Sequence, residues 1–280
     1  MELHAGKFRF QFPRPALVMG ILNVTPDSFS DGGRYLDCEA AVAHGLELER
    51  QGAEILDVGG ESTRPNAVPV AEAEELRRVL PVIERLTREA KVPISIDTMK
   101  PGVARAALAA GASIVNDVGA NRSETEMWRI TAKAGAGYVC MHMQGTPRTM
   151  QAEPHYQDVV REVRDFFSLQ MEQMFRCGLS TGQIIVDPGI GFGKTLEHNL
   201  ELLGGLRELA SFGQPLLLGV SRKSFLGKLL GAGLESRLAP ALACACLAVE
   251  AGANILRVHD VAETLQAIRM TEAILARRRK

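Results

Sequence analysis

Polar residues able to bind or activate a ligand follow short apolar runs throughout this chain. They are Asn23, Asp57, Asp97, Asn116, His142, Asp187, Ser221, Arg257 and His259. Together they belong to eight separate runs, so they meet only if the runs are neighbouring strands whose carboxyl ends share one edge. Buried polar groups cost free energy unless they find partners. The spacing therefore indicates a ligand site at that edge.

Four of these residues, Asp57, Asp97, Asn116 and Asp187, form a group of acceptors. A nitrogen heterocycle with an amidine-like N–H/NH2 edge would satisfy such oxygens in a bidentate manner. The competing interpretation of any one of them is capping of the helix that follows its strand. Four such residues after four different strands favour the ligand.

A second group suits an anion. Arg64 follows Ser62 and Thr63 in a loop, and the last apolar run contains Arg257 and ends at His259. Arginine binds phosphate or carboxylate through two parallel hydrogen bonds. Arg257 lies inside an apolar run, where a cation needs a partner, whereas a surface arginine would simply be solvated.

Lys223 stands at the predicted start of a helix, where a cation opposes the helix dipole, so a functional lysine is favoured over a solvent-facing one. Asn23 is the candidate metal ligand, because Mg²⁺ commonly binds through one or two protein oxygens, substrate phosphates and water. His142 and His155 lack the spacing of a zinc site and are interpreted as structural or peripheral. GIGFGK, at 189–194, lacks the full spacing of a P-loop and is not assigned to phosphate.

Apolar runs alternate with amphipathic segments along the chain that carries these residues. Such alternation predicts an α/β fold, a single (β/α)8 TIM barrel over 1–280 with its active site at the C-terminal ends of the strands. Residues 1–15 are expected to form a short N-terminal hairpin. The strands are predicted near 16–24, 54–59, 93–97, 113–118, 137–142, 184–187, 215–220 and 254–259.

Three of the predicted strand-to-helix connections are long and rich in Gly, Pro, Ser and Asp. They read TPDSFSDGGR, GGESTRPNAVPV and MQGTPRTMQAEPHY. A barrel needs only a few residues in these connections, so long ones at the mouth indicate binding loops or lids.

The composition is that of an ordinary globular protein, with 46% hydrophobic and 23% charged residues among 280. A net charge of −1 gives no electrostatic reason to expect a nucleic acid or an anionic membrane as partner. Five cysteines at irregular spacing suggest reduced thiols. The N-terminal residues lack the apolar core of a signal peptide, and no run reaches the roughly 18 apolar residues of a membrane span. We therefore expect a cytoplasmic protein.

Eight longer motifs in this chain are similar to those of a known protein family. LNVTPDSFSDGG, DVGGESTRP, ISIDTMKP, NDV, MHMQGTPRTMQ, DPGIGFGK, SRKS and RVHDV occur in this order between Leu17 and Ala267. In this order they closely resemble the bacterial dihydropteroate synthases, of the pterin-binding barrel superfamily. The resemblance implies a folate-synthesis transferase, a sulfonamide target that joins (7,8-dihydropterin-6-yl)methyl diphosphate to 4-aminobenzoate and releases 7,8-dihydropteroate and diphosphate.

The resemblance also implies a role for each matching residue. The pterin is held by Asp97, Asn116, Met141, Asp187, Phe192 and Lys223. The diphosphate is bound by Asn23, Thr63, Arg64, Arg257 and His259, with Mg²⁺ bridging through Asn23. The aminobenzoate is framed by Phe29, Thr63, Pro65 and Ser221. Direct roles in catalysis fall to Asp31, Asp97, Lys223, Arg257 and His259, and a homodimer is implied.

The implied chemistry agrees with the groupings drawn from the residues. Loss of diphosphate builds negative charge, which Mg²⁺, Arg and His stabilise as it develops. An electron-rich pterin spreads positive charge at its methylene carbon, so we predict a dissociative, SN1-like path. The two long loops that carry Asp31 and Arg64 are expected to order over the diphosphate and exclude water.

Two other interpretations remain open from the sequence. A corrinoid-linked methyltetrahydrofolate methyltransferase shares the pterin-binding barrel but does not need TPDSFSDGG, STRP or Lys223 with Arg257 and His259. A non-catalytic paralogue that binds pterin would have lost part of the diphosphate site or of the first loop. The first-loop motif TPDSFSDGG and the residues expected to bind the diphosphate are all present here.

Overall fold

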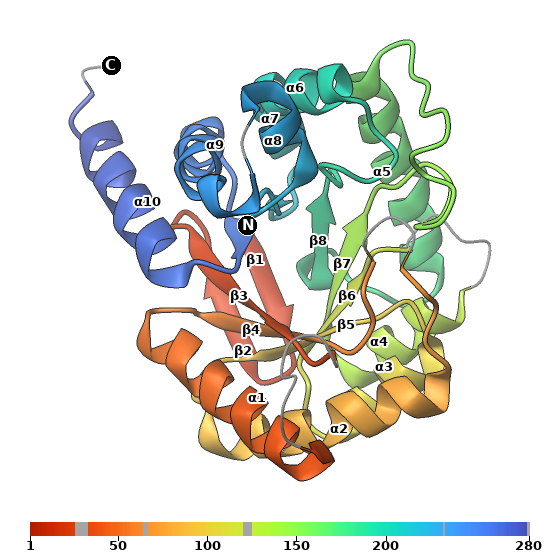
Figure 1. The fold of residues 1–280 in the computed structure, drawn as a ribbon. Helices are drawn as coiled ribbons and strands as arrows, with labels where there is room; N and C mark the ends of the chain where they lie inside the picture. Colours follow the sequence, from red (N-terminus) through yellow and green to blue (C-terminus); the bar gives the residue numbers. More distant parts are fainter. Residues whose placement is uncertain (26–32, 64–66, 120–124, 232, 279–280) are drawn as a thin grey trace.

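Eight parallel strands alternate with helices around a barrel in the computed structural model (Figure 1), which describes residues 1–25, 33–63, 67–119, 125–231 and 233–278. The barrel strands are β3 (Leu17–Asn23), β4 (Ile55–Gly59), β5 (Ile94–Asp97), β6 (Ile114–Asp117), β7 (Gly137–Met141), β8 (Ile184–Asp187), β9 (Leu217–Leu218) and β10 (Ile255–Val258). Their order in the sheet is β8-β7-β6-β5-β4-β3-β10-β9, and a parallel bridge between Val186 and Leu216 joins the two edges. The predicted (β/α)8 barrel is confirmed.

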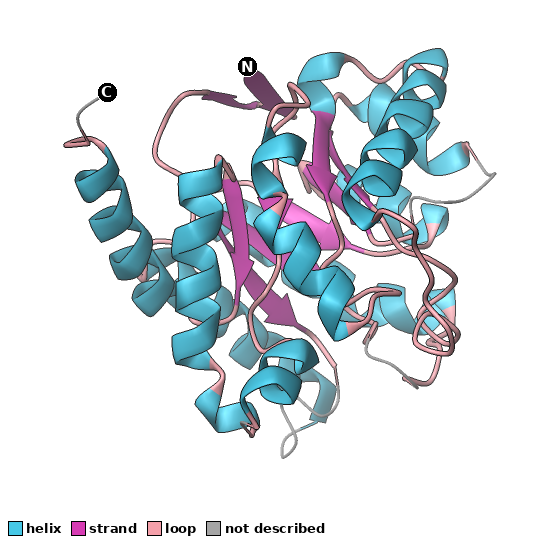
Figure 2. Cartoon of the chain, turned by 90° about the horizontal axis from the view of Figure 1, so that it is seen from above, coloured by secondary structure: helices cyan, strands magenta, loops and turns pink. Residues whose placement is uncertain are grey.

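Helices cover the outside of this barrel (Figure 2). Within the described residues they are α1 (Gly33–Arg50), α2 (Glu72–Glu89), α3 (Pro101–Ala109), α4 (Glu126–Ala134), α5 (Val159–Arg176), α6 (Leu196–Gly204), α7 (Leu206–Ala210), α8 (Ser224–Leu230), α9 (Leu238–Ala251) and α10 (Val261–Leu275). The apolar stripe of α2 shows how they pack, because Val79, Ile83 and Leu86 recur at helical spacing and are fully buried. No helix in the described part of the chain combines the length and the apolar character needed to cross a bilayer.

The ninth strand is shorter than its apolar run. Residues 215–220 were predicted as a strand, whereas the ladder covers only Leu217–Leu218. The backbone N–H of Leu216 donates to the side-chain Oδ1 of Asn254 at 2.9 Å instead of to a neighbouring strand. Pro215 has no N–H to donate. Regular pairing therefore stops at both residues, and a single bridge closes the barrel.

An antiparallel hairpin, β1 (Glu2–Ala5) with β2 (Phe8–Gln11), lies across the amino ends of the strands (Figure 2). Its apolar side chains join those that point into the barrel, and together they fill its lower half. This cluster contains Leu3, Ala5, Phe10, Phe12, Leu17, Met19, Ile55, Ile114, Val139, Ile185, Leu217 and Ile255. The amino end is thus closed by packing, and the polar inward positions lie at the opposite end.

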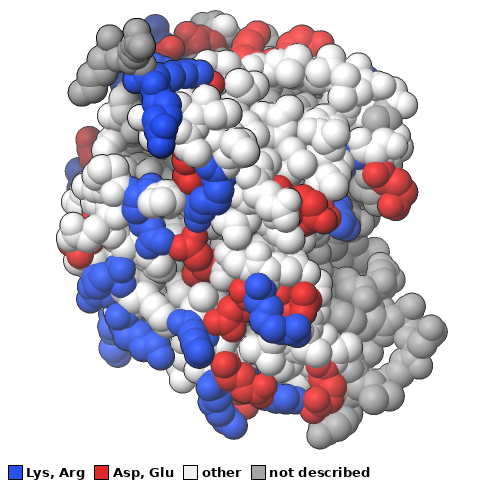
Figure 3. Space-filling view, turned by 90° about the vertical axis from the view of Figure 1, so that its left-hand side faces the viewer, with Lys and Arg blue, Asp and Glu red and all other residues white. Residues whose placement is uncertain are grey.

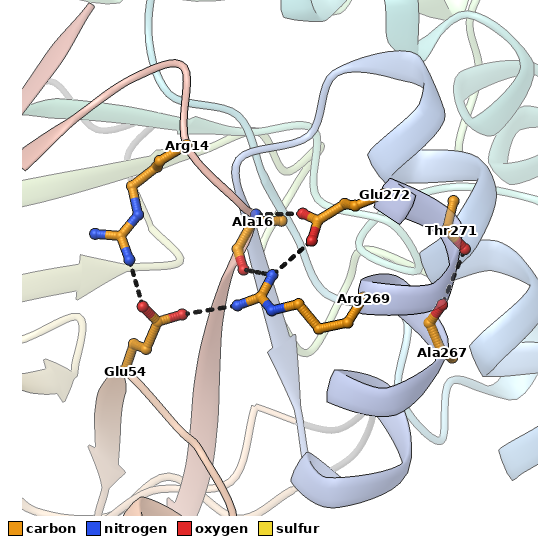
Figure 4. Close-up of polar contacts among 7 residues, drawn as sticks. All are labelled: Arg14, Ala16, Glu54, Ala267, Arg269, Thr271 and Glu272. Atoms are coloured by element: carbon orange, nitrogen blue, oxygen red, sulfur yellow. Dashed lines mark hydrogen bonds and ion pairs between the residues drawn. The ribbon is translucent and has the colours of Figure 1, made fainter. Parts of the chain in front are cut away.

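A polar network fastens the same end to the last helix (Figure 4). Glu54, just before β4, accepts from Arg14 and, at 3.3 Å, from Arg269 of α10. Glu272 accepts from the Ala16 backbone N–H at 2.6 Å and from Arg269 at 2.8 Å. These bonds hold the segment before β3 against α10. They are partly exposed, so each contributes modestly to stability.

Candidate active site

Strand alternation explains why the polar residues meet. On β10, Ile255 joins the apolar cluster inside the barrel and Leu256 joins the outer core, so Arg257 points inward again. The same alternation on the other strands turns Asp57, Asp97, Asn116 and Asp187 inward, one layer above the apolar filling. The predicted acceptors and the cation therefore share the carboxyl end of one barrel.

Arg257 bridges two carboxylates. Its Nε donates to Asp57 Oδ2 at 2.6 Å, and an Nη donates to Asp97 Oδ2 at 2.5 Å. Burial opposes the cation, but the charges of Asp57 and Asp97 outweigh it and raise the pKa of Arg257. Burial also raises the pKa of Asp97 to about 7, although the Arg257 charge works in the opposite direction. The partner that a buried arginine requires is thus a pair of aspartates.

Asp57 is the structural centre of this group. Its side chain is fully buried, and Oδ2 accepts from both Arg257 and the Asn116 amide, the latter at 3.0 Å. Oδ1 is buried without a partner among the described residues. Sequence reasoning grouped Asp57 with the ligand acceptors, whereas the structure shows it holding Arg257 and Asn116. A hydrogen bond between residues 59 positions apart leaves no trace in local spacing.

Asp187 and Lys223 face the same space. Asp187 Oδ1 accepts from the Gly189 N–H at 2.8 Å, and Oδ2 has no partner among the residues described. Burial raises the pKa of Asp187. Lys223 Nζ lies 3.9 Å from the centre of the Phe192 ring. Burial, followed by repulsion from Arg257, lowers the pKa of Lys223 to about 8.

A strained turn presents Lys223. Arg222, between β9 and α8, has φ of 59°, a left-handed conformation that a side chain with a Cβ rarely adopts. Arg222 is anchored by Asp260 at 2.7 Å. The residue before it, Ser221, is buried, and its Oγ lies 3.0 Å from His259 Nδ1. This turn therefore brings Ser221 and Lys223 to the mouth of the barrel and places Ser221 in contact with His259.

The remaining predicted residues divide into two sets. Asn23 ends β3, half-buried, and its amide has no hydrogen-bond partner in the described part of the chain; Thr63 is also half-buried, in the loop after β4. Met141 and Phe192 pack in one apolar cluster with Val118, Met143 and Met150, which forms a wall beside the acceptors. Phe29, Asp31, Arg64 and Pro65 lie outside the described residues.

Two charged groups near the mouth were missed from the sequence. Lys194, the last residue of GIGFGK, is 3% exposed and lies 3.0 Å from His142 Nδ1. Lys100 joins Glu61, at 2.5 Å, to the fully buried Glu75. Each of these contacts joins residues from separate elements, so no regular spacing along the chain could have predicted it. His142 itself is buried beside Phe166 and Tyr156, as its structural interpretation predicts.

Known proteins match this chain over nearly its full length. The family model described as a pterin binding enzyme matches residues 19–259. The dihydropteroate synthase of Escherichia coli (strain K12) is 50% identical over 261 residues, which cover 92% of this chain and 92% of that protein. The chain belongs to the dihydropteroate synthase family.

Solved structures of dihydropteroate synthases agree with this assignment. The Yersinia pestis enzyme in a sulfonamide drug complex has a TM-score of 0.92 and 43% identity, covering 99% of this chain and 100% of that one. The Xanthomonas albilineans enzyme in complex with 7,8-dihydropteroate has a TM-score of 0.87 and 45% identity, covering 99% of each chain. The predicted family, its transferase class and its fold are thus confirmed.

Proposed function

We propose that this chain condenses (7,8-dihydropterin-6-yl)methyl diphosphate with 4-aminobenzoate, the reaction of its family, at the carboxyl end of the barrel. One observation carries the residue-level proposal. Asp97, Asn116 and Asp187 come from three strands, and each keeps a side-chain oxygen without a partner among the described residues, with the Lys223 ammonium nearby. Acceptors and one donor converge there, as an amino-pterin ring edge requires.

The pterin would bind in this layer of polar residues. Asp187 would accept from the 2-amino group and the ring N–H, and Lys223 would donate to the carbonyl and a ring nitrogen. Asp97 and Asn116 would hold the other edge, with Met141 and Phe192 against the ring face. The depth of the layer supports this, because it begins directly above the apolar filling of the barrel.

The charge of the site favours a dissociative step. Asp57, Asp97 and Asp187 supply three carboxyl groups, and Arg257 and Lys223 supply two cations, so the cluster gains an excess negative charge as Asp97 ionises, at about pH 7. Positive charge that develops on the pterin methylene carbon as the C–O bond breaks would be stabilised there. The arylamine nitrogen is neutral at pH 7 and would attack without a strong base.

The leaving diphosphate would lie above this cluster. Arginine carries five N–H donors, and two of those of Arg257 are used by Asp57 and Asp97. The others remain for an anion. His259 would donate to the same anion, and Ser221, whose hydroxyl lies on His259 Nδ1, would orient that ring as well as frame the aminobenzoate. Thr63 and Arg64 would complete the diphosphate site, and Phe29, Asp31 and Pro65 would act from the two loops.

Asn23 is suited to a Mg²⁺ ion that is bound mainly by the phosphates of the substrate and takes only one or two oxygens from the protein. No group of three or more His, Cys, Asp or Glu side chains within the described residues is arranged to hold a metal ion. The Asn23 amide is at the mouth and without a described partner, which supplies one neutral oxygen. Mg²⁺ usually takes one or two protein oxygens with phosphates and water. Bound there with the diphosphate, it would neutralise charge on the leaving group.

We further propose that the chain is one domain, acts in the cytoplasm, and forms a homodimer through α9 and α10. These neighbouring helices expose the apolar side chains of Leu247, Met270 and Ile274, at 64%, 64% and 57%. On the face shown in Figure 3, basic and acidic side chains are intermixed, so this face presents no basic patch for a nucleic acid, in keeping with the proposed small-molecule substrates.

The decisive assay measures diphosphate release from the dihydropterin diphosphate with Mg²⁺, with and without 4-aminobenzoate. Release coupled one-to-one to dihydropteroate formation supports the proposal. Tight pterin binding without product would instead identify a non-catalytic pterin-binding protein and refute it.

A further inference from the structure

The ammonium group of Lys194 is buried and makes no direct ion pair with a carboxylate among the described residues, although the charge of Asp187 acts on it. It is 3% exposed, and its hydrogen-bond partners are His142 Nδ1 at 3.0 Å, the Phe192 carbonyl at 2.9 Å and the His142 carbonyl at 3.4 Å. Burial lowers its pKa to about 7. A buried amine costs free energy unless its donors are satisfied. Here all the acceptors belong to two mouth loops.

These bonds fasten the loop after β8 to the loop after β7. Two further bonds act in the same way, from Tyr156 Oη to the Gly193 carbonyl and from Gln151 Nε2 to the Gly191 carbonyl, both at 2.8 Å. The loops are in backbone contact, because a Cβ added to Gly193 would lie 2.6 Å from the Gln144 carbonyl oxygen. The loop after β8 is therefore held at several points, and Lys194 is its innermost attachment.

The fastened loop lies against Lys223. The Phe192 ring is 3.9 Å from Lys223 Nζ, and a Cβ added to Gly191 would lie 3.3 Å from Lys223 Cδ. The backbone carbonyl that Lys194 holds belongs to Phe192 itself. A continuous path of contacts therefore runs from the buried amine through Phe192 to Lys223.

We propose that Lys194 is a positioning residue for the pterin site: it fixes the Phe192 backbone, and the Phe192 ring in turn holds the Lys223 ammonium over the pterin. Lys194 itself touches no substrate in this arrangement. The proposal rests on the proposed function, which assigns Phe192 and Lys223 to the pterin. It gives the lysine of GIGFGK a purpose other than phosphate binding.

Lys194→Met tests the proposal, because it keeps an apolar stem of similar length and removes the donors. We expect KM for the dihydropterin diphosphate to rise about tenfold, the effect of losing a charge-assisted hydrogen bond, with kcat and the KM for 4-aminobenzoate within about twofold. Lys228→Met, the same change at an exposed position of α8, is the matched control and should leave all three unchanged. Lys194→Gln retains a donor for the Phe192 carbonyl and should recover part of the affinity.

A double-mutant cycle distinguishes positioning from general stability. If Lys194 acts through Phe192, then Lys194→Met in the Phe192→Ala background should change the pterin KM by less than about twofold, because the ring through which it acts is gone. Tyr156→Phe removes another attachment of the same loop and carries the same test if the Met variant does not fold. We expect it to raise the pterin KM about threefold, again only when Phe192 is present.

Equal effects with and without Phe192, or a folded Lys194→Met enzyme with an unchanged pterin KM, would overturn the proposal. Its failure is distinct from failure of the proposed function. A wild-type chain that forms no dihydropteroate refutes the function, whereas normal wild-type turnover with an unaffected Lys194→Met variant refutes only the positioning role.

Discussion

Replacement of Arg257 by Met should destabilise the fold far more than a typical surface substitution. It leaves Asp57, which is fully buried, and Asp97, whose side chain is 11% exposed, without their shared cation. Breaking a buried ion pair by removing one partner costs about 3–5 kcal/mol. With an m-value of about 3 kcal/mol/M in urea, the midpoint of unfolding should fall by about 1–1.7 M.

Urea unfolding followed by tryptophan fluorescence measures this shift. Trp128 is the single tryptophan of the chain and is 2% exposed, so its emission reports opening of the core. Arg269→Met is the matched control, because that arginine makes two ion pairs at the other end of the barrel while 36% exposed. A half-exposed pair contributes about 1 kcal/mol or less, so its midpoint should move by about 0.3 M or less.

A double-mutant cycle with Asp57 tests whether the loss of stability comes from the unpaired Asp57 carboxylate. Asp57→Asn removes the charge that Arg257 leaves unpaired, so the double variant should be more stable than the sum of the single effects predicts, by about 2 kcal/mol. Equal midpoints for the two arginine variants, or strictly additive effects of Arg257→Met and Asp57→Asn, would refute the argument that Arg257 and Asp57 stabilise the fold as a buried ion pair.

Three other predictions concern binding and the mouth loops. Lys223 is a cation below about pH 8 and neutral above it, so affinity for a pterin ligand measured by calorimetry should decline as pH rises through about 8, and Lys223→Met should abolish that decline; a pH-independent wild type would contradict it. Asn23→Ala should raise the Mg²⁺ concentration needed for half-maximal turnover about tenfold, as loss of one ligand to a weakly held ion does, with recovery at high Mg²⁺; an unchanged requirement would remove Asn23 from the metal site. Gly189→Ala should lower the melting temperature by several degrees, because φ is +67° and the new Cβ would lie 1.9 Å from the His142 carbonyl oxygen; calorimetry showing an unchanged transition would contradict that strain.

Most of the barrel could be predicted from the sequence because strands buried on both faces are almost continuously apolar. The predicted run 184–187 coincides with β8, and the run near 113–118 contains β6. The ninth strand was overestimated at both ends, and its start depends on the side chain of Asn254, which accepts from the N–H of Leu216 and belongs to another part of the chain. Periodicity along the chain carries no information about such a partner.

The residues that make up the site could be predicted from the sequence, but most of the hydrogen bonds and ion pairs among them could not. Asp97, Asn116, Asp187 and Arg257 end or occupy apolar runs, which is enough to bring them to one mouth. The role of Asp57 was not predictable, because a ligand acceptor and a holder of Arg257 occupy the same kind of inward position on a strand. The burial of Lys194 was equally hidden, since glycine-rich loops give no periodic signal of what covers them.

Residue types and their short-range order were enough to predict the alternation of strands and helices, the end of the barrel at which the polar residues gather, and the family. The tertiary structure decided which polar groups bind one another: Arg257 with Asp57, 200 positions away, Ser221 with His259, and Lys194 with His142. The physical reason is that the direction and depth of a side chain follow from strand register and loop packing. Those are set by the closed barrel as a whole.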